Sequence, residues 1–214
     1  MPNRDLNNMR QSYEATYLLE EDCDSNPFIQ FDKWFQEALK INAIEPNAMQ
    51  LATVGANGQP SIRTVLLKSF DKKGFVFYTN YTSKKGKQLE ENNKIALLFW
   101  LREQERQVII EGSVSKIPYE ENSIYFHSRP RDSQLAAKVS NQSSSIKDRA
   151  TLEELFETQK ALFENKEIPL KESWGGYLVV PTLFEFWQGR ANRLHDRIQY
   201  KVEDNNWKLE RLMP

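Results

Sequence analysis

Several features that commonly identify a protein class are scarce or absent in this sequence. A single cysteine, Cys23, excludes an intrachain disulfide, and two histidines with no HExxH or CxxC pattern give no basis for a metal site. The longest apolar run, residues 95–101, has seven residues, whereas a membrane span needs about twenty. There is no GxSxG, P-loop or GxGxxG motif. These absences argue against secreted disulfide scaffolds, membrane-spanning proteins, zinc enzymes, serine hydrolases, nucleotide motors and Rossmann enzymes.

An excess of charge of one sign is also missing. The 29 basic and 30 acidic side chains give a formal net charge of −1, so any anion must be bound by a local cluster rather than by a general positive field. This argues against a nucleic-acid-binding or membrane-binding protein. The first residues contain no apolar segment of the kind found in signal peptides, so we expect a cytoplasmic protein.

The length of 214 residues and the 39% hydrophobic content predict one large domain. Residues 1–30 are polar without a usable period and are predicted to form an N-terminal arm or lid, and residues 31–214 the domain itself. The domain begins with an apolar stripe of helical period that should end near Pro46. The stripe consists of Phe31, Trp34, Phe35, Ala38 and Leu39.

Short strand-like segments follow this helix. They cover residues 48–54, 61–70, 75–80, 95–101 and 107–116, with strong hairpin turn signals at 56–60 and 71–74. An antiparallel meander is the simplest arrangement, interrupted by a short helix at 83–92. Helices are expected from Pro118 to about residue 163, with a break at Arg129 and Pro130, and strands return at 175–180, 183–188, 198–202 and 207–212. The pattern predicts an α+β fold, an antiparallel barrel or sandwich with helices packed outside.

Two clusters of cations occur in the first half of the chain. Arg63 and Lys68 flank an apolar strand segment, which suggests an anionic ligand, although two cations at a sheet edge would look the same. Strict alternation places them on opposite faces. Lys84 and Lys85 open a short helix directly after a strand, where free amides and the helix dipole favour a phosphate; a solvated lysine run is the alternative.

Two further clusters occur in the second half. Tyr125 and Arg129 share a helical face before Pro130, and Asp132 or Ser133 could cap the next helix, which would suit a second phosphate or a plain salt-bridged corner. His127 lies off that face and is interpreted as structural. In residues 190–197, strand alternation would place Arg193, His195 and Arg197 on one face, an arrangement that favours an anionic or electron-rich partner.

Taken in order, these segments resemble the pyridoxine/pyridoxamine 5'-phosphate oxidases, flavin enzymes of vitamin B6 metabolism. The resemblance extends from Arg10 to Pro214. The most specific pieces are RTVLLK (63–68), YTN (78–80), ERQV (105–108), YFHSRPRDSQ (125–134), FWQG (186–189) and RLHDR (193–197).

The resemblance implies a split antiparallel β-barrel with peripheral helices, forming a homodimer that binds FMN at the subunit interface. It assigns FMN contacts to two sets of residues. The first set is Arg63, Thr64, Val65, Leu66, Leu67, Lys68, Tyr78, Thr79, Lys84 and Lys85; the second is Gln107, Gln142, Ser143, Trp187 and Arg197. Relatives often have arginine at the position of Lys84, so this chain keeps the charge there but loses the bidentate fork.

For the substrate, the resemblance implies a phosphate site and a site for the pyridine ring. The phosphate would be held by Lys68, Tyr125, Arg129 and Ser133; the ring would meet Arg193, Leu194 and His195 under a lid formed by Arg10, Gln11, Ser12 and Tyr13. The implied reaction oxidises pyridoxine or pyridoxamine 5'-phosphate to pyridoxal 5'-phosphate by hydride transfer to flavin, and O2 is reduced to hydrogen peroxide. Arg193 and His195 are the catalytic candidates, with binding or general-base roles both open for His195.

Two other functions share most of these features. A split-barrel FMN reductase of another substrate would use the same flavin residues, and a non-enzymatic protein that carries flavin or pyridoxal phosphate would bind without turnover. The segments around Arg129 and His195 favour the oxidase.

Overall fold

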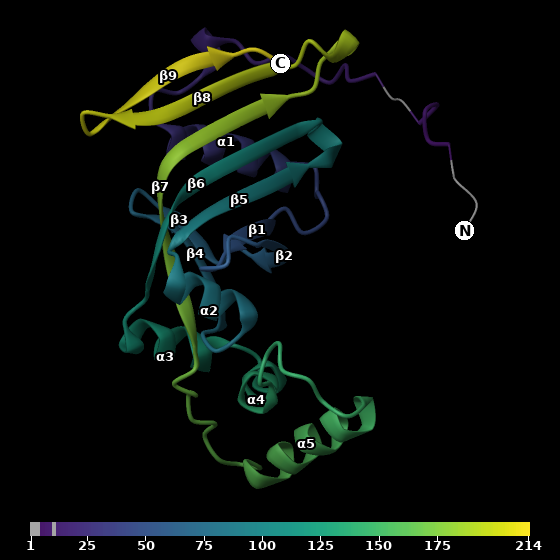
Figure 1. The fold of residues 1–214 in the computed structure, drawn as a ribbon, viewed down its shortest axis with the longest axis vertical. Coiled ribbons are helices and arrows are strands. Elements are labelled where there is room, and N and C mark those ends of the chain that lie inside the picture. The colour runs from purple at the N-terminus through teal and green to yellow at the C-terminus, as the bar shows by residue number, and fades with distance from the viewer. Residues whose placement is uncertain (1–4, 10–11) are drawn as a thin grey trace. The chain divides into compact units, whose positions relative to one another are not determined.

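The computed structural model describes residues 5–9 and 12–214, and these form two compact units. The terminal unit takes its described residues from Met1–Met49, Leu97–Glu111 and Thr182–Pro214; the central unit consists of Gln50–Ala96 and Gly112–Pro181. Several strands of the single sheet in Figure 1 contribute residues to both units.

Nine strands, five α-helices and three 3-10 turns are found in the described part of the chain. The strands are β1 (Ala48–Val54), β2 (Pro60–Leu66), β3 (Ser69–Asp71), β4 (Gly74–Asn80), β5 (Lys94–Leu101), β6 (Arg106–Lys116), β7 (Trp174–Gln188), β8 (Asp196–Glu203) and β9 (Asn206–Leu212). The helices are α1 (Pro27–Lys40), α2 (Lys84–Glu91), α3 (Tyr119–Ser128), α4 (Arg131–Val139) and α5 (Arg149–Leu162), and the 3-10 turns are η1 (Glu20–Asp22), η2 (Arg102–Gln104) and η3 (Ala191–Arg193). The expected α+β class is confirmed. None of the described helices is long and apolar enough to cross a membrane.

The strand order is β2-β1-β5-β6-β7-β4-β3, with β8 beside β7 and β9 beside β8. The expected hairpins are present, but the simple meander is wrong, because β4 pairs with β7, which lies about a hundred residues further along the chain. In that pair Phe77 faces Tyr177, and their buried rings stack at 5.5 Å. Burial of aromatic side chains along this pair stabilises the distant pairing.

Strand β7 is one strand where the sequence suggested two. Its first half pairs with β4 as far as Val179, and its second half pairs with β8 from Leu183 onward. Pro181 therefore lies where the strand changes partner along that edge. Proline has no N–H to donate to a neighbouring strand. Because Pro181 lies between the two pairings, opposite neither β4 nor β8, the missing donor is tolerated there and the strand continues.

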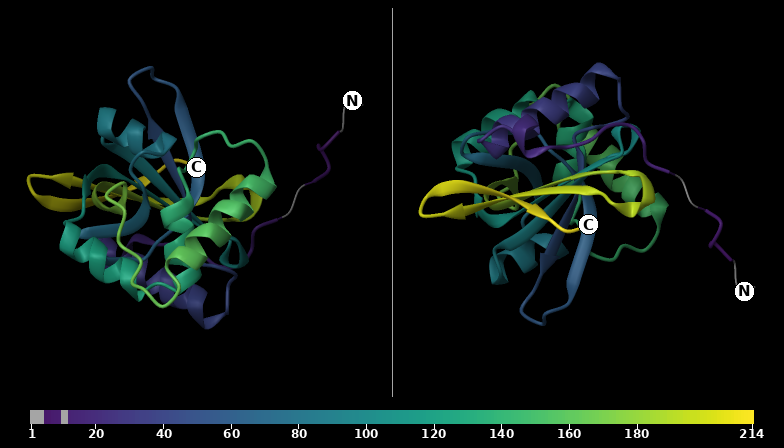
Figure 2. Two further views of the ribbon diagram at one scale, coloured as in Figure 1. Left: turned by 90° about the horizontal axis from the view of Figure 1, so that it is seen from below. Right: turned by 90° about the horizontal axis from the view of Figure 1, so that it is seen from above.

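In the terminal unit, α1 begins at Pro27, four residues before the predicted start. Asn26 caps it by accepting a hydrogen bond from the Phe28 amide at 3.0 Å, and Pro27 occupies the first turn, so the helix begins inside the predicted arm. Phe31, Trp34 and Ala38 are buried as the apolar stripe predicted, whereas Leu39 is exposed. Figure 2 shows β8 and β9 side by side as a long hairpin.

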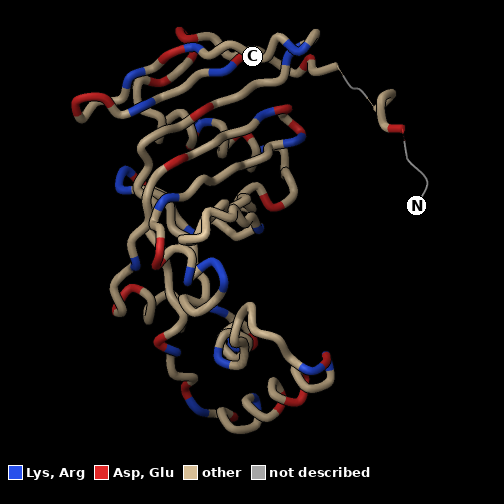
Figure 3. The backbone as a smooth tube through the Cα atoms, viewed as in Figure 1, with Lys and Arg blue, Asp and Glu red and all other residues tan. Residues whose placement is uncertain are grey.

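In the central unit, helices α3, α4 and α5 follow one another after β6. Phe126 of α3 and Leu135 of α4 are fully buried against Trp174 and Ile168. The N-cap of α4 is Pro130, without a side-chain cap, so the predicted cap at Asp132 or Ser133 is wrong. Along the backbone, basic and acidic residues are interspersed without a long tract of one sign (Figure 3).

Candidate active site

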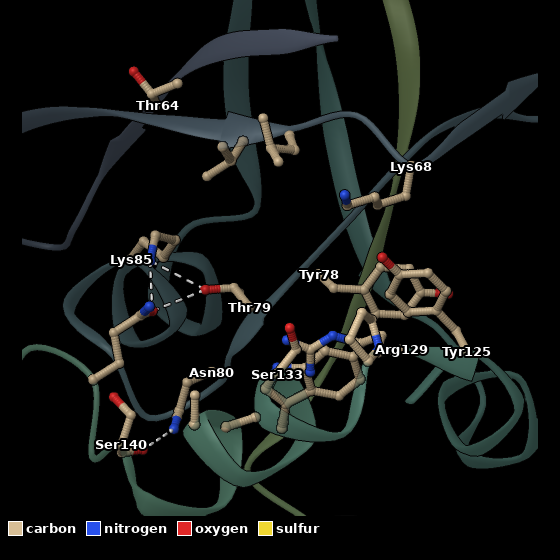
Figure 4. Close-up of a pocket in the computed structure, with 17 residues that line it drawn as sticks. Thr64, Lys68, Tyr78, Thr79, Asn80, Lys85, Tyr125, Arg129, Ser133 and Ser140 are labelled. Carbon is tan, nitrogen blue, oxygen red and sulfur yellow. Dashed lines mark hydrogen bonds between the residues drawn. The ribbon is translucent and has the colours of Figure 1, made fainter. Parts of the chain in front are cut away.

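A pocket of about 600 Å³ lies in the central unit, between β2, β4, α2, α3 and α4 (Figure 4). Its size is in the range of small-molecule and cofactor sites. Eleven of the residues predicted to bind FMN or substrate line it: Thr64, Val65, Leu66, Lys68, Tyr78, Thr79, Lys85, Tyr125, Arg129, Ser133 and Gln142. Segments separated by up to about eighty residues in the sequence thus converge on one cavity.

One side of this pocket holds a buried ammonium group. Lys85 of α2 is 8% exposed, and its Nζ donates to Gln142 Oε1 at 2.7 Å and to Thr79 Oγ1 at 3.1 Å, both neutral acceptors. Burial lowers the pKa of Lys85 to about 8, and the nearby Arg63 adds to the effect. No carboxylate pairs with Lys85 among the described residues. A buried cation with only neutral partners is a position where an anionic ligand is stabilised.

The local fold explains why Lys85 is held here. Ser83 caps α2 by accepting from the Gly86 amide at 3.2 Å, which starts the helix directly after the turn that follows β4. Gly86 lies against the Tyr81 backbone: a Cβ at this position would be 2.0 Å from Tyr81 O. The helix therefore sits close to the end of β4, and its first turn points Lys85 into the pocket (Figure 4).

Arg63 belongs to the same neighbourhood but does not line the pocket. Its guanidinium donates to Leu51 O at 3.0 Å and to Thr53 Oγ1 at 2.7 Å, with a longer contact to Gln88 at 3.4 Å. Burial lowers the pKa of Arg63. Lys68 does line the pocket; because β2 ends at Leu66, Lys68 lies beyond the strand, and the predicted placement of the two cations on opposite strand faces stays a prediction.

The other side of the pocket holds the guanidinium of Arg129. Its Nη1 is buried without a hydrogen-bond partner, and its carbon lies 4.8 Å above the ring of Trp174. Burial lowers the pKa of Arg129, although Tyr125 opposes the shift. An unpaired buried N–H of a cation is costly unless a ligand completes it. Lys68 and Tyr125 lie on this side too (Figure 4).

Three aromatic rings form the wall beside Arg129. Tyr78 and Tyr125 stack at 3.9 Å, and Tyr78 stacks on Trp174 at 5.3 Å. Burial raises the pKa of both tyrosines, so their hydroxyls are neutral donors at pH 7. Ser133 lies in the first turn of α4, where free amides and the helix dipole add to the positive field.

Three predicted FMN residues of the central unit lie outside the pocket lining besides Arg63. Leu67 is 5% exposed and part of the core. Lys84 is exposed and lies in a separate surface hollow with Asn57 and Glu91, and Ser143 is exposed with a left-handed backbone.

The remaining described candidates belong to the terminal unit. Trp187 of β7 lies directly opposite Arg197 of β8, and the His195 ring lies 4.6 Å from the Trp187 ring. Tyr13 meets both rings edge-on, at 5.8 Å from Trp187 and 5.9 Å from His195. The structure thus brings four sequence candidates together in this unit.

The guanidinium of Arg197 forms a two-pronged pair with Glu185, at 2.8 and 3.0 Å, and donates to Met213 O. This pair raises the pKa of Arg197. Gln107 is half-buried, and Ser12 is exposed. Arg10 and Gln11 lie outside the described residues.

The predicted single strand face with Arg193, His195 and Arg197 is wrong. Strand β8 begins only at Asp196, and Asn192 and Arg193 adopt left-handed backbone angles, with φ of 58° and 62°. Arg193 and Leu194 are therefore exposed on a loop. Burial lowers the pKa of His195, and Arg193 adds to this, so the imidazole is neutral at pH 7.

Sequence reasoning missed Trp174, which supports Arg129. A signal was present in the two glycines that follow it: a Cβ at Gly175 would be 2.2 Å from the Tyr81 hydroxyl, and one at Gly176 would be 2.9 Å from the Tyr78 ring. Paired glycines inside a strand indicate a close approach by a neighbouring segment. Of these approaches, the one by Tyr78 to Gly176 belongs to the aromatic wall of the pocket.

Comparison with known proteins agrees with this geometry. The family model described as pyridoxamine 5'-phosphate oxidase matches residues 33–160, and the one described as pyridoxine 5'-phosphate oxidase C-terminal dimerisation region matches residues 174–214. A pyridoxine/pyridoxamine 5'-phosphate oxidase of Crocosphaera subtropica is 54% identical over 213 residues, covering 98% of this chain and 100% of the relative. One from Aliarcobacter butzleri is 51% identical over 211 residues, covering 98% and 100%.

Among solved structures, PhzG from Burkholderia lata, in complex with tetrahydrophenazine-1-carboxylic acid, has a TM-score of 0.88 and 29% identity, covering 95% of this chain and 100% of its own. An FMN-binding protein from Nostoc punctiforme, related to pyridoxamine 5'-phosphate oxidase, has a TM-score of 0.72 at 16% identity, covering 90% and 100%. The expected split-barrel fold is confirmed by these similarities.

Proposed function

Because the chain belongs to the pyridoxamine 5'-phosphate oxidase family, we propose that it oxidises pyridoxine 5'-phosphate and pyridoxamine 5'-phosphate to pyridoxal 5'-phosphate, with FMN as cofactor and O2 as electron acceptor. When bound, FMN would accept hydride from the C4' carbon of the substrate and pass both electrons to O2, giving hydrogen peroxide. The amine substrate leaves the reaction as an imine, which hydrolyses to the aldehyde with loss of ammonia.

The observation that carries this proposal is the presence of two anion positions in one pocket. Lys85 is a buried cation and Arg129 a half-buried one with a buried Nη1; neither has a carboxylate partner among the described residues, and they lie on different sides of the same 600 Å³ cavity. Both FMN and the substrate carry a phosphate. A pocket with two separate cationic positions suits a pair of phosphorylated ligands held against each other.

FMN fits the side of the pocket that holds Lys85. Its phosphate would replace the neutral partners of Lys85, with Arg63 supplying positive potential from the neighbouring strand. Thr79 and Gln142 would then offer hydrogen bonds to the cofactor. Lys84 and Ser143 remain predictions for this site.

The substrate phosphate fits the side that holds Arg129. The unpartnered Nη1 of Arg129 would donate to it, joined by Lys68, the Tyr125 hydroxyl and Ser133 at the start of α4. The guanidinium carbon lies 4.8 Å over the Trp174 ring, a cation–π contact that helps to hold Arg129 in place. These groups bind and orient the phosphate and leave the reacting carbon to other residues.

We assign the terminal-unit cluster to the ring end of the ligands. In a homodimer with FMN at the interface, Gln107, Trp187 and Arg197 of one subunit would complete the flavin site formed by the central unit of its partner; the match to a dimerisation region supports this arrangement. Arg193 would orient the reacting face of the substrate, and Arg197 would stabilise negative charge on the reduced cofactor. His195, neutral at pH 7, would bind the polar edge of the pyridine ring.

The test is anaerobic mixing of the purified holoenzyme with pyridoxine 5'-phosphate while the visible flavin band is recorded. We expect bleaching that reverses when air is admitted, with pyridoxal 5'-phosphate as product. A yellow protein that does not bleach would instead support a reductase of another substrate or a flavin carrier. A protein that takes up no FMN would overturn the proposal.

A further inference from the structure

The loop that carries Arg193 and His195 is held closed by a buried carboxylate to which no role has been assigned. Asp196, the first residue of β8, is 9% exposed. Its Oδ2 accepts from Arg190 Nη1 at 2.9 Å and from the Leu18 amide at 3.0 Å, and its Oδ1 accepts from Arg211 Nη1 at 2.8 Å. Burial alone would raise the pKa of Asp196, but these hydrogen bonds outweigh it and the pKa is lowered. The group is therefore ionised at neutral pH.

One of these contacts acts on His195. Arg190 donates its backbone amide to His195 Nδ1 at 3.1 Å, while its side chain is fixed by Asp196. Because Nδ1 accepts, the neutral imidazole carries its proton on Nε2. Arg190 and Asp196 thus close the loop around Asn192 and Arg193, two non-glycine residues in left-handed conformations that need support from their surroundings.

A second contact acts on the N-terminal segment. Leu18 is 3% exposed and is held at both polar atoms: its amide donates to Asp196, and its carbonyl accepts from Arg211 at 2.9 Å. Five residues earlier, Tyr13 packs edge-on against His195 and Trp187. A Cβ at Gly189 would be 2.8 Å from Tyr13, so this segment lies directly on the loop.

We infer that Asp196 is a positioning residue for the substrate ring. Through Arg190 it holds His195 as an Nε2–H hydrogen-bond donor, and through Leu18 it holds Tyr13 against the His195 ring. The inference rests on the proposed function for the identity of the ligand. It assigns His195 a donor role, because the nitrogen that a general base would need is the one already occupied by the Arg190 amide. Asp196 touches neither ligand itself.

The first experiment measures the state of His195 without turnover. The chain has two histidines, so a His127→Gln background leaves His195 as the sole imidazole in ¹⁵N-histidine spectra of the holoenzyme. We expect a single Nε2–H tautomer, and in Asp196→Asn a signal averaged between tautomers. An unchanged tautomer in Asp196→Asn would overturn the inference.

The second experiment measures steady-state rates. Asp196→Asn should raise KM for pyridoxine 5'-phosphate about tenfold, the range for one hydrogen bond to a charged group, while FMN affinity stays within about twofold. Arg190→Met should have an equal or smaller effect, because Asp196 also holds the Leu18 amide, and the double variant should be no worse than Asp196→Asn alone, since Arg190 acts through Asp196. This role would be contradicted if the double variant multiplied the KM increases of the two single variants, or if FMN affinity fell by the same factor as KM rose.

Glu203→Gln is the matched control, because Glu203 is another β8 carboxylate that pairs with a β9 cation, Lys208 at 3.2 Å, away from the loop. It should leave both KM and the histidine spectrum unchanged. Thermal unfolding of each variant identifies any loss of fold. If the wild-type enzyme does not oxidise the substrate, the proposed function fails, and the histidine spectra still decide the role of Asp196.

Discussion

At the scale of single residues, the chemistry of the pocket depends on two cations that folding shields from water, Lys85 largely and Arg129 in part, and leaves without a carboxylate partner among the described residues. Lys85 has only amide and hydroxyl oxygens as partners, and Arg129 has an aromatic face and an orphan N–H. Sequence alone marked both residues as anion-binding candidates, since charged residues at a helix start and beside Pro130 suggest phosphate. The burial of Lys85 and of the Arg129 Nη1 atom, which strengthens their attraction for an anion, is visible only in the structure.

Lys85→Met should separate stability from cofactor binding. The folded-state pKa is lowered to about 8 and the unfolded value is near 10.4, so between these values the unfolded chain binds more protons and apoprotein stability rises with pH. The charge therefore destabilises the apoprotein at pH 7, and Lys85→Met should raise its Tm.

The same variant should bind FMN roughly tenfold to a hundredfold more weakly at pH 7, by loss of a charged hydrogen bond. Wild-type affinity should fall as pH rises through about 8, as Lys85 loses its proton, and Lys85→Met should lack this step. Fluorescence titration of the apoprotein with FMN at a series of pH values measures this affinity. Lys87→Met, on the exposed side of α2, is the control; an identical pH profile in wild type and Lys85→Met would refute the assignment.

Arg129→Ala should raise KM for the substrate by about tenfold to a hundredfold and change FMN affinity little. Arg129→Lys keeps the charge but loses the planar stacking on Trp174, so it should restore only part of the affinity. Initial rates and FMN titrations on the same preparations measure both quantities. Equal losses for substrate and cofactor would show that the two anion positions are not separate.

At the scale of elements, local signals located most strands and helices within a few residues, and the errors have identifiable causes. The strand at β1 was predicted with its observed bounds. The start of α1 was missed because the cap at Asn26 and Pro27 precedes the apolar stripe, and β7 was predicted as two strands, one on each side of Pro181 and Thr182. In the loop before β8, Asn192 and Arg193 have left-handed backbone angles. The strand therefore does not extend back to Arg193, and the predicted alternation of side chains from Arg193 to Arg197 is not present.

Gly86→Ala tests how closely α2 must approach β4. Alanine favours a helix over glycine by about 1 kcal/mol, yet its Cβ would meet the Tyr81 carbonyl at 2.0 Å, and overpacking of this kind costs about 1–3 kcal/mol. We expect a lower Tm and weaker FMN binding, because Lys85 moves with the helix. Lys87→Ala, at an exposed position of α2 where alanine changes helix propensity little and meets no such clash, serves as control. A Gly86→Ala protein more stable than wild type would mean that the helix can shift freely.

At the scale of the whole molecule, the candidates fall into two groups. The central unit holds the phosphate positions, and the terminal unit holds Trp187, His195 and Arg197. The proposed dimer joins the groups across subunits.

Mixed dimers test that arrangement directly. At a substrate concentration below the wild-type KM, Arg129→Ala and Arg193→Ala should each have low activity as homodimers, whereas a heterodimer with one subunit of each should have one intact site and about half of wild-type activity. Two different affinity tags allow the heterodimer to be purified before rates are measured. No recovery would show that each site takes both arginines from one chain.

The sequence by itself determined the α+β class, the positions of most elements and the residue types of the site, because periodicity, turn residues and clusters of cations are local properties. Tertiary structure decided the pairing of β4 with β7, the burial of Lys85 and of the Arg129 Nη1 atom, the Trp174 wall and the contacts of Asp196. Each of these depends on segments distant in the chain, and their proximity follows from the burial of apolar surface and the pairing of polar groups over the whole fold, which no local pattern records.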